Sequence, residues 1–137
     1  MSIFVDTSAL FAILDADDLN HTSAKETWAR LLDADETLVT TNYVLVETHA
    51  LVQRRLGMAA VKALYQDIVP VLQVEWIDSS QHAVAVGKLT ATADRQLSLV
   101  DWVSFTLMRQ LGIKAAFAFD ADFDQQGFNA TLSSDQT

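Results

Sequence analysis

Two acidic residues of this chain directly follow short apolar runs, a position where α/β proteins often carry out chemistry. Asp6 follows residues 3–5, and Asp120 follows residues 115–119, with Asp122 close behind. Two carboxylates at the same edge of one sheet repel each other unless a proton or a cation lies between them. An Asp before a helix can also be a simple N-cap. Asp6 alone fits either role, whereas the pair together favours metal binding.

Glu47 lies inside residues 43–52, one of the most apolar helical stretches of the chain. Its neighbours three and four positions away are all apolar: Tyr43, Val44, Ala50 and Leu51. The spacing predicts that Glu47 shares their packed face, where a carboxylate is costly unless it is paired or binds a metal. The alternative is a Glu at the edge of this stripe, which reaches water or Arg54.

Asp101 has an equally good structural explanation. Ser98 and Asp101 fit the capping-box pattern at the start of a helix, which needs no further chemistry. Its helix neighbours Leu97 and Phe105 are apolar, however, so the Asp also points towards a packed region. Capping, metal binding and both roles together all stay open for Asp101.

Several acids that converge from separate elements suit a hard divalent cation. Mg²⁺ prefers oxygen ligands, keeps several waters and uses few carboxylates together with substrate phosphate. Two such ions can stabilise the attacking and leaving oxygens of phosphodiester hydrolysis. The sequence offers no better nucleophile, because it has no cysteine and no histidine lies near Thr7 or Ser8 in the sequence.

The elements that must position these acids alternate between strands and helices. Apolar runs predict strands at residues 3–5, 37–41, 71–77, 115–119 and 128–132. Helical spacing predicts a short helix over 10–14, one from about Asn20 with a capping box at 23–26, and others over 42–57, 58–69, 80–95 and 99–111. Strands that alternate with helices, and that are short and apolar rather than alternating in polarity, predict an α/β fold with a mainly parallel sheet covered on both faces.

Length and composition set the remaining bounds. The 137 residues fit one domain, which we expect to cover residues 1–132, with residues 133–137 as a frayed tail. The lack of cysteine, of a signal peptide and of a long apolar run predicts a cytoplasmic protein with no membrane segment. A net charge of −9 argues against a surface that coats nucleic acid, but a nuclease whose acids hold cations remains compatible with it.

Four sequence blocks resemble those of PIN-domain proteins, in the right order over residues 3–128. They are Val5-Asp6-Thr7-Ser8-Ala9-Leu10, residues 41–48 around Glu47, residues 97–105 around Asp101, and Phe119-Asp120-Ala121-Asp122-Phe123 with Gly127-Phe128. The likeness is greatest to the VapC-type toxins and their solitary bacterial relatives. It implies a three-layer α/β/α sandwich and a Mg²⁺- or Mn²⁺-dependent endoribonuclease that hydrolyses RNA phosphodiester bonds.

The resemblance also implies roles for single residues. By position, Asp6, Glu47 and Asp101 correspond to the three core acids of the family and Asp120 to the fourth. Many relatives have Ser or Thr at the position of Ala118 and a histidine at that of Asp122. These departures leave open whether Asp120, Asp122 or both serve the metals, and whether one metal binds or two.

Partners are implied by the same likeness. Family members often form homodimers, and the toxins are neutralised by a small antitoxin that lies across the active-site cleft. Four apolar side chains could form part of such a groove, or could be ordinary core: Phe11, Leu14, Trp28 and Leu31. The RNA target cannot be read from the sequence, and Arg54, Arg55, Arg95 and Arg109 fit phosphate contacts and solvated helix positions equally well.

Two other functions compete with this one. A receiver-like phosphoacceptor also carries acids at strand ends, but it needs a lysine at a late strand end, and Lys114 precedes its strand. A PIN fold kept only for binding RNA or protein, without turnover, is the second alternative, and the presence of all four acids disfavours it.

Overall fold

The first strand of the chain lies at the centre of a five-stranded sheet. The structure, a computed structural model, describes residues 1–130, and the strand order is β3-β2-β1-β4-β5. The strands are β1 Ser2–Val5, β2 Thr37–Thr41, β3 Gln73–Glu75, β4 Ala115–Phe117 and β5 Asn129–Ala130. Every pair is parallel, with Ile3 opposite both Leu38 and Ala115. The predicted parallel sheet is therefore confirmed.

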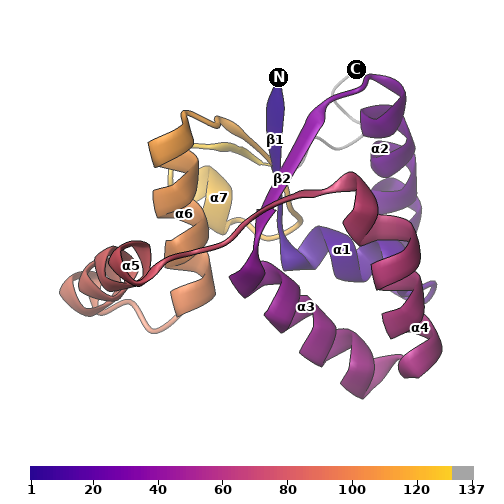
Figure 1. The fold of residues 1–137 in the computed structure, drawn as a ribbon, viewed down its shortest axis with the longest axis horizontal. Coiled ribbons are helices and arrows are strands. Elements are labelled where there is room, and N and C mark those ends of the chain that lie inside the picture. The colour runs from indigo at the N-terminus through magenta and orange to yellow at the C-terminus, as the bar shows by residue number, and fades with distance from the viewer. Residues whose placement is uncertain (131–137) are drawn as a thin grey trace.

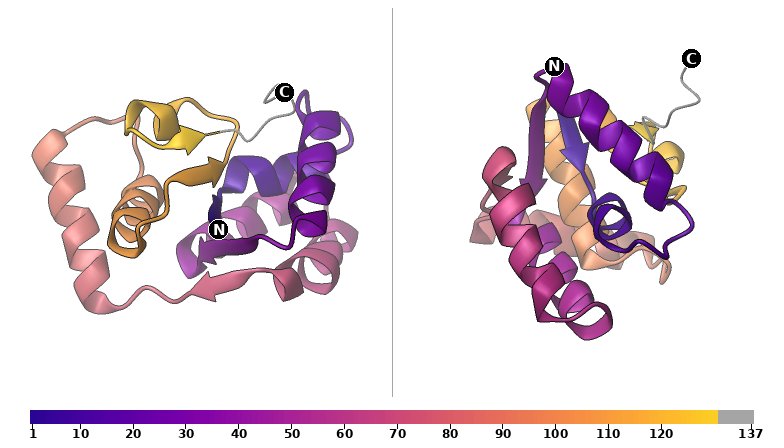
Figure 2. Two further views of the ribbon diagram at one scale, coloured as in Figure 1. Left: turned by 90° about the horizontal axis from the view of Figure 1, so that it is seen from above. Right: turned by 90° about the vertical axis from the view of Figure 1, so that its right-hand side faces the viewer.

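The central strands are apolar because helices cover both of their faces. Phe4, Val5, Val39 and Phe117 are all buried in the main core. Figures 1 and 2 show α1, α2 and α4 on one side of the sheet and α5, α6 and α7 on the other. The helices are α1 Thr7–Leu14, α2 His21–Asp33, α3 Asn42–Arg55, α4 Met58–Ala63, α5 Ser79–Thr92, α6 Leu99–Leu111 and α7 Asp122–Gln125. The predicted three-layer α/β/α architecture is confirmed.

The direction of the chain reverses at β1, and this creates the crevice that matters for function. From β1 the chain moves outward to β2 and β3, and then returns across the sheet to place β4 on the other side of β1. In such sheets the carboxyl ends of the two strands beside the reversal splay apart, and ligands bind there. Asp6 follows β1, and the segment that carries Asp120 follows β4.

The bounds of β3, β4 and β5 differ from the sequence predictions. The strand predicted at 115–119 stops at Phe117, because the backbone N–H of Phe119 donates to the Ser8 hydroxyl rather than to a neighbouring strand. The strand predicted over 71–77 is only β3, Gln73–Glu75. Of the strand predicted over 128–132, the structure has Asn129–Ala130. Residues 131–132, like the predicted frayed tail at 133–137, lie outside the described residues.

The helices also show three differences. The capping box predicted at residues 23–26 is wrong, because α2 already begins at His21, whose ring Nδ1 bonds to the Ala12 carbonyl. The helix predicted over 58–69 is divided into α4, a π-helical turn η1 (Leu64–Ile68) and a 3₁₀ turn η2 (Val69–Val71) that contains Pro70. The short helix α7 was not predicted. No helix within residues 1–130 is long and apolar enough to cross a membrane.

Candidate active site

Asp6 is a buried carboxylate at the end of the central strand. Its side chain is only 4% exposed, and its Oδ2 accepts hydrogen bonds from the Ser8 backbone N–H at 3.2 Å and from the Ser8 hydroxyl at 2.8 Å. Asp6 is thus the N-cap of α1. Burial, and then the charge of Asp120, raise the pKa of Asp6 to about 7. Capping therefore coexists with a strongly perturbed acid, which is typical of functional sites.

Asp120 and Asp122 lie on the segment between β4 and α7. The Oδ1 of Asp120 accepts a hydrogen bond from the Asp122 backbone N–H at 3.2 Å, which turns the chain into α7. Burial, followed by the charges of Asp122 and then Asp101, raises the pKa of Asp120 to about 6. This segment is joined to the end of β1 by the Ser8 hydroxyl, which accepts from Phe119 at 2.9 Å.

Asp101 forms the capping box that the sequence predicts, and it faces the other acids as well. The Ser98 backbone N–H donates to Asp101 Oδ2 at 2.8 Å, and the Asp101 N–H donates to Ser98 Oγ at 3.1 Å. Burial raises the pKa of Asp101, as does the nearby charge of Asp122. The reciprocal bonds occupy Oδ2, so the helix start holds this carboxylate in a fixed orientation.

Glu47 lies on α3, across the opening from the aspartates, and it is exposed. The prediction that it shares a packed face is wrong, because α3 buries a different stripe: Val44, Leu45, Thr48 and Val52. Glu47 instead lies at the edge of this stripe and is exposed to solvent, which was the alternative to a packed position. Within the described residues it forms no ion pair with Arg54.

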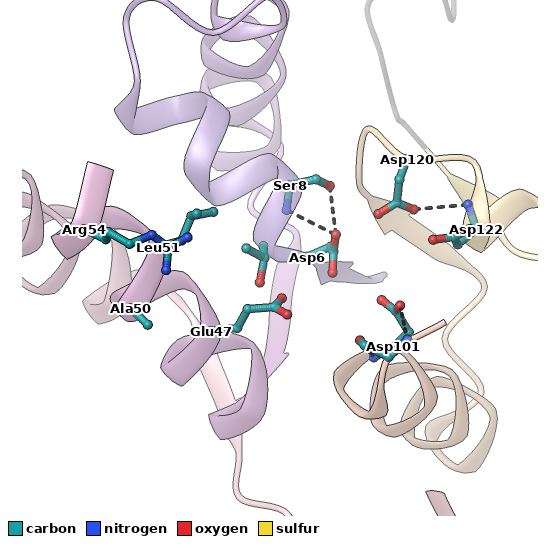
Figure 3. A pocket seen from close by; sticks show the side chains of 11 residues that line it. Asp6, Ser8, Glu47, Ala50, Leu51, Arg54, Asp101, Asp120 and Asp122 are labelled. Carbon is teal, nitrogen blue, oxygen red and sulfur yellow. Dashed lines mark hydrogen bonds between the residues drawn. The ribbon is translucent and has the colours of Figure 1, made fainter. Parts of the chain in front are cut away.

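These acids share one pocket of about 510 Å³ at the end of β1 (Figure 3). The lining residues are Asp6, Thr7, Ser8, Glu47, Ala50, Leu51, Arg54, Ser98, Asp101, Asp120 and Asp122. Asp6, Asp101, Asp120 and Asp122 gather around one side of it, and the Glu47 carboxylate points towards them from α3. All five acids singled out in the sequence are therefore brought together by the fold.

The donor set of this pocket fits a hydrated hard cation. All the candidate ligands are oxygens, and their mutual repulsion is relieved by a cation or a proton. Within residues 1–130, no group of three acidic or imidazole side chains is placed so that it could hold a metal ion together. The arrangement suits Mg²⁺, which keeps several waters and needs only one or two carboxylates, better than a cation enclosed by protein.

Thr7 and Ser8, which are residues of the pocket, join the elements that carry the acids. The hydroxyl of Thr48 donates to that of Thr7 at 3.1 Å, which joins α3 to the start of α1 beside Glu47. Ser8 holds both Asp6 and the segment before Asp120. The Asp-x-Ser spacing, typical of a side chain that bonds to the backbone two residues on, was the available signal.

Two groups of residues with open roles are placed by the fold. Arg109 donates to the Gln126 carbonyl at 2.9 Å and lies over the Phe128 ring, so its role is structural.

Of the apolar side chains considered for an antitoxin groove, Phe11 and Leu31 are buried in the core, and Leu14 and Trp28 are half-buried. These four belong mainly to the packing of α1 and α2.

Comparison with known proteins gives three findings. The PIN domain family matches residues 3–129. VapC20 of Mycobacterium tuberculosis, a 23S rRNA-specific endonuclease, is 40% identical over 127 residues, which are 92% of this chain and 95% of that protein. The crystal structure of VapC20, described as a sarcin-ricin loop cleaving toxin, has 37% identity and a TM-score of 0.81 over 92% of this chain and 95% of that chain.

One further solved structure shares only its fold with this chain. VapBC2 from Rickettsia felis, bound to a promoter DNA fragment, has a TM-score of 0.69 at 11% identity, and covers 95% of this chain and 97% of that one.

Proposed function

The chain belongs to the PIN-domain family, and we propose that it is a Mg²⁺- or Mn²⁺-dependent endoribonuclease. The observation that carries the proposal is the single pocket in which Asp6, Asp101, Asp120 and Glu47 meet at the topological reversal of the sheet. Burial first, and then the neighbouring acids, raise the pKa of Asp6 and of Asp120, so the charged forms of both carboxyls need a cation beside them. Divalent cations supply the missing positive charge.

Each acid has a distinct part in this proposal. Ser8 bonds to Oδ2 of Asp6, and Ser98 bonds to Oδ2 of Asp101. The Oδ1 of each carboxylate accepts no bond from these serines and could bind a cation. Glu47 approaches from α3, and Asp120, with Asp122 beside it, closes the opposite side. Bound divalent ions would stabilise charge on the attacking and leaving oxygens of the phosphodiester. The buried position of Asp6 also limits the access of bulk water at the end of β1.

We propose 23S rRNA as the substrate, with the sarcin-ricin loop as the site of cleavage. The support is the 40% identity to a 23S rRNA-specific endonuclease over nearly the whole of both chains. A nuclease of ribosomal RNA acts in the cytoplasm. Residues 1–132 would then be one catalytic domain.

The proposal is tested by incubating the purified protein with ribosomes and with deproteinised 23S rRNA, with Mn²⁺ or Mg²⁺ and with chelator. We expect one main cut in the sarcin-ricin loop, which primer extension maps, and its loss with chelator or in Asp101→Asn. Binding of the rRNA with no cut under any metal condition would instead favour a binding module without turnover.

Two protein partners belong to the proposal. The likeness to VapC20, which is a toxin, supports an antitoxin partner that covers the acid pocket. A homodimer is supported by apolar side chains exposed on one surface: Val46, Tyr65 and Trp76, which line a second pocket of about 450 Å³. Burial of such a surface is favourable, since large exposed apolar patches mark interfaces. Sedimentation of wild type and Trp76→Asp tests the dimer.

A further inference from the structure

The wall of the acid pocket formed by α3 carries a positive charge that the metal chemistry does not use. Of the described residues that line the pocket, Arg54 is the only basic one. It is exposed, and no carboxylate within residues 1–130 forms an ion pair with it. Its guanidinium is turned from α3 towards the opening (Figure 3). A cation beside five acids that remains unpaired is free to bind an external anion.

The position of Arg54 on α3 follows from helix geometry. Glu47, Ala50, Leu51 and Arg54 are spaced by three, one and three residues, so they form one stripe along the helix. Arg54 lies seven residues after Glu47, which is about 10 Å further along the helix axis. The backbone of Arg54 therefore lies about two helical turns beyond that of Glu47. Arg54 is therefore placed for a phosphate that flanks the scissile one.

We propose that Arg54 is a substrate-positioning residue, which binds a backbone phosphate of RNA next to the cleaved bond and holds the strand along the α3 stripe. The inference rests on the proposed ribonuclease function. A guanidinium binds phosphate with two parallel hydrogen bonds, which fixes orientation as well as position. Ala50 and Leu51, between Arg54 and Glu47, present no charge that would compete with the strand.

The competing explanation is that Arg54 only stabilises its helix. Arg54 and Arg55 both lie in the last turn of α3, where a positive charge interacts favourably with the helix dipole. Arg55 is also exposed, but it does not line the pocket. The dipole effect is the same for the two residues, whereas the proposed phosphate contact belongs to Arg54 alone. Arg55→Gln is therefore the matched control.

The test measures single-turnover cleavage of an RNA fragment of the 23S sarcin-ricin loop over a range of enzyme concentrations. Arg54→Gln should raise the half-saturating concentration about tenfold with little change in the maximal rate, as expected for the loss of a charged hydrogen bond. The half-saturating concentration of Arg54→Lys should lie between those of wild type and Arg54→Gln. That of Arg55→Gln should stay within about twofold of wild type. The salt slope of binding should fall by about 0.7 for Arg54→Gln, the value for one phosphate of a single strand.

A second readout separates this inference from the proposed function. Binding of the same fluorescent RNA fragment is measured by anisotropy in an Asp101→Asn background, with Arg54→Gln or Arg55→Gln added, and the Mn²⁺-induced rise in melting temperature is recorded for each single Arg variant. Weaker RNA binding for Arg54→Gln alone, with an unchanged Mn²⁺ response, supports the inference. Equal binding by the two double variants, or a fall in maximal rate alone, overturns it. Absence of cleavage by wild type counts against the ribonuclease, while the binding comparison still decides the role of Arg54.

Discussion

The hydroxyl of Ser8 lies between the carboxylate of Asp6, to which it donates, and the backbone of Phe119, from which it accepts. One side chain thus fixes the acid at the end of β1 and the segment that leads from β4 to Asp120. The two halves of the pocket meet through this hydroxyl, so its loss should affect both.

Ser8→Ala should destabilise the protein by about 1–3 kcal/mol, because the Phe119 N–H loses its partner in a half-buried site. It should also raise the pKa of Asp6 further, since the hydrogen bond from the Ser8 hydroxyl lowers it. Urea unfolding measures the first effect. Ser80→Ala, at an exposed position of α5, is the control and should change stability by no more than about 0.5 kcal/mol. Equal stability of the two variants would contradict the bridging role of Ser8.

The stability of the metal-free protein should fall as the pH rises from about 4 to about 7. The pKa of Asp6 is about 7 in the folded state against a usual 3.8, so the folded protein holds a proton that the unfolded chain has lost. The contribution of Asp6 is fully present below the unfolded pKa and is lost through the folded one, with a slope of up to about 1.4 kcal/mol per pH unit. Urea unfolding in chelator at several pH values measures it. Asp6→Asn should remove this component, and parallel profiles of the two proteins would refute the prediction.

Asp101→Asn should raise the melting temperature of the metal-free protein and reduce the rise produced by Mn²⁺. The substitution relieves repulsion from Asp122, while an Asn side chain can still accept from the Ser98 N–H. Mn²⁺ raises the melting temperature because it binds only the folded state. The free energy of unfolding then increases by about 2.7 kcal/mol at a hundredfold excess of Mn²⁺ over Kd. Melting curves with and without Mn²⁺ decide the matter. A lower metal-free melting temperature with an intact Mn²⁺ response would leave Asp101 as a helix cap only.

Glu47→Gln should leave stability almost unchanged and reduce cleavage. The side chain is exposed and contributes little to folding, so we expect a change within about 0.5 kcal/mol. Its carboxylate points into the acid pocket. Loss of a side chain that only contacts the ligands of a metal lowers activity or metal affinity by about 10–100-fold, so we expect at least this effect from the loss of Glu47. Glu26→Gln, exposed on α2, is the control. Full cleavage by Glu47→Gln would remove this residue from the site.

The sequence was sufficient for the architecture and for the acids that meet in the pocket, but not for the burial of each residue. Short apolar strands and helix signals such as Ser98 and Gly112 predict the alternating elements, because these depend on local chemistry. The exposure of Glu47 depends instead on which stripe of α3 meets α1 and β2, which is decided by tertiary contacts such as Thr48 with Thr7. The end of β4 was mispredicted for the same reason, since Phe119 bonds to a hydroxyl from the other end of the chain.

The central position of β1 has a consequence for the timing of activity during synthesis. The ribosome makes Asp6 well before Asp120, and β1 gains its second neighbour only when β4 has been made. Contacts between residues so far apart in sequence form late, because closing a long loop is entropically costly. A nascent chain therefore carries an incomplete acid pocket until β4 and the segment with Asp120 have been made. If the chain cleaves ribosomal RNA as proposed, the ribosome that makes it meets no complete acid pocket before β4 has been made.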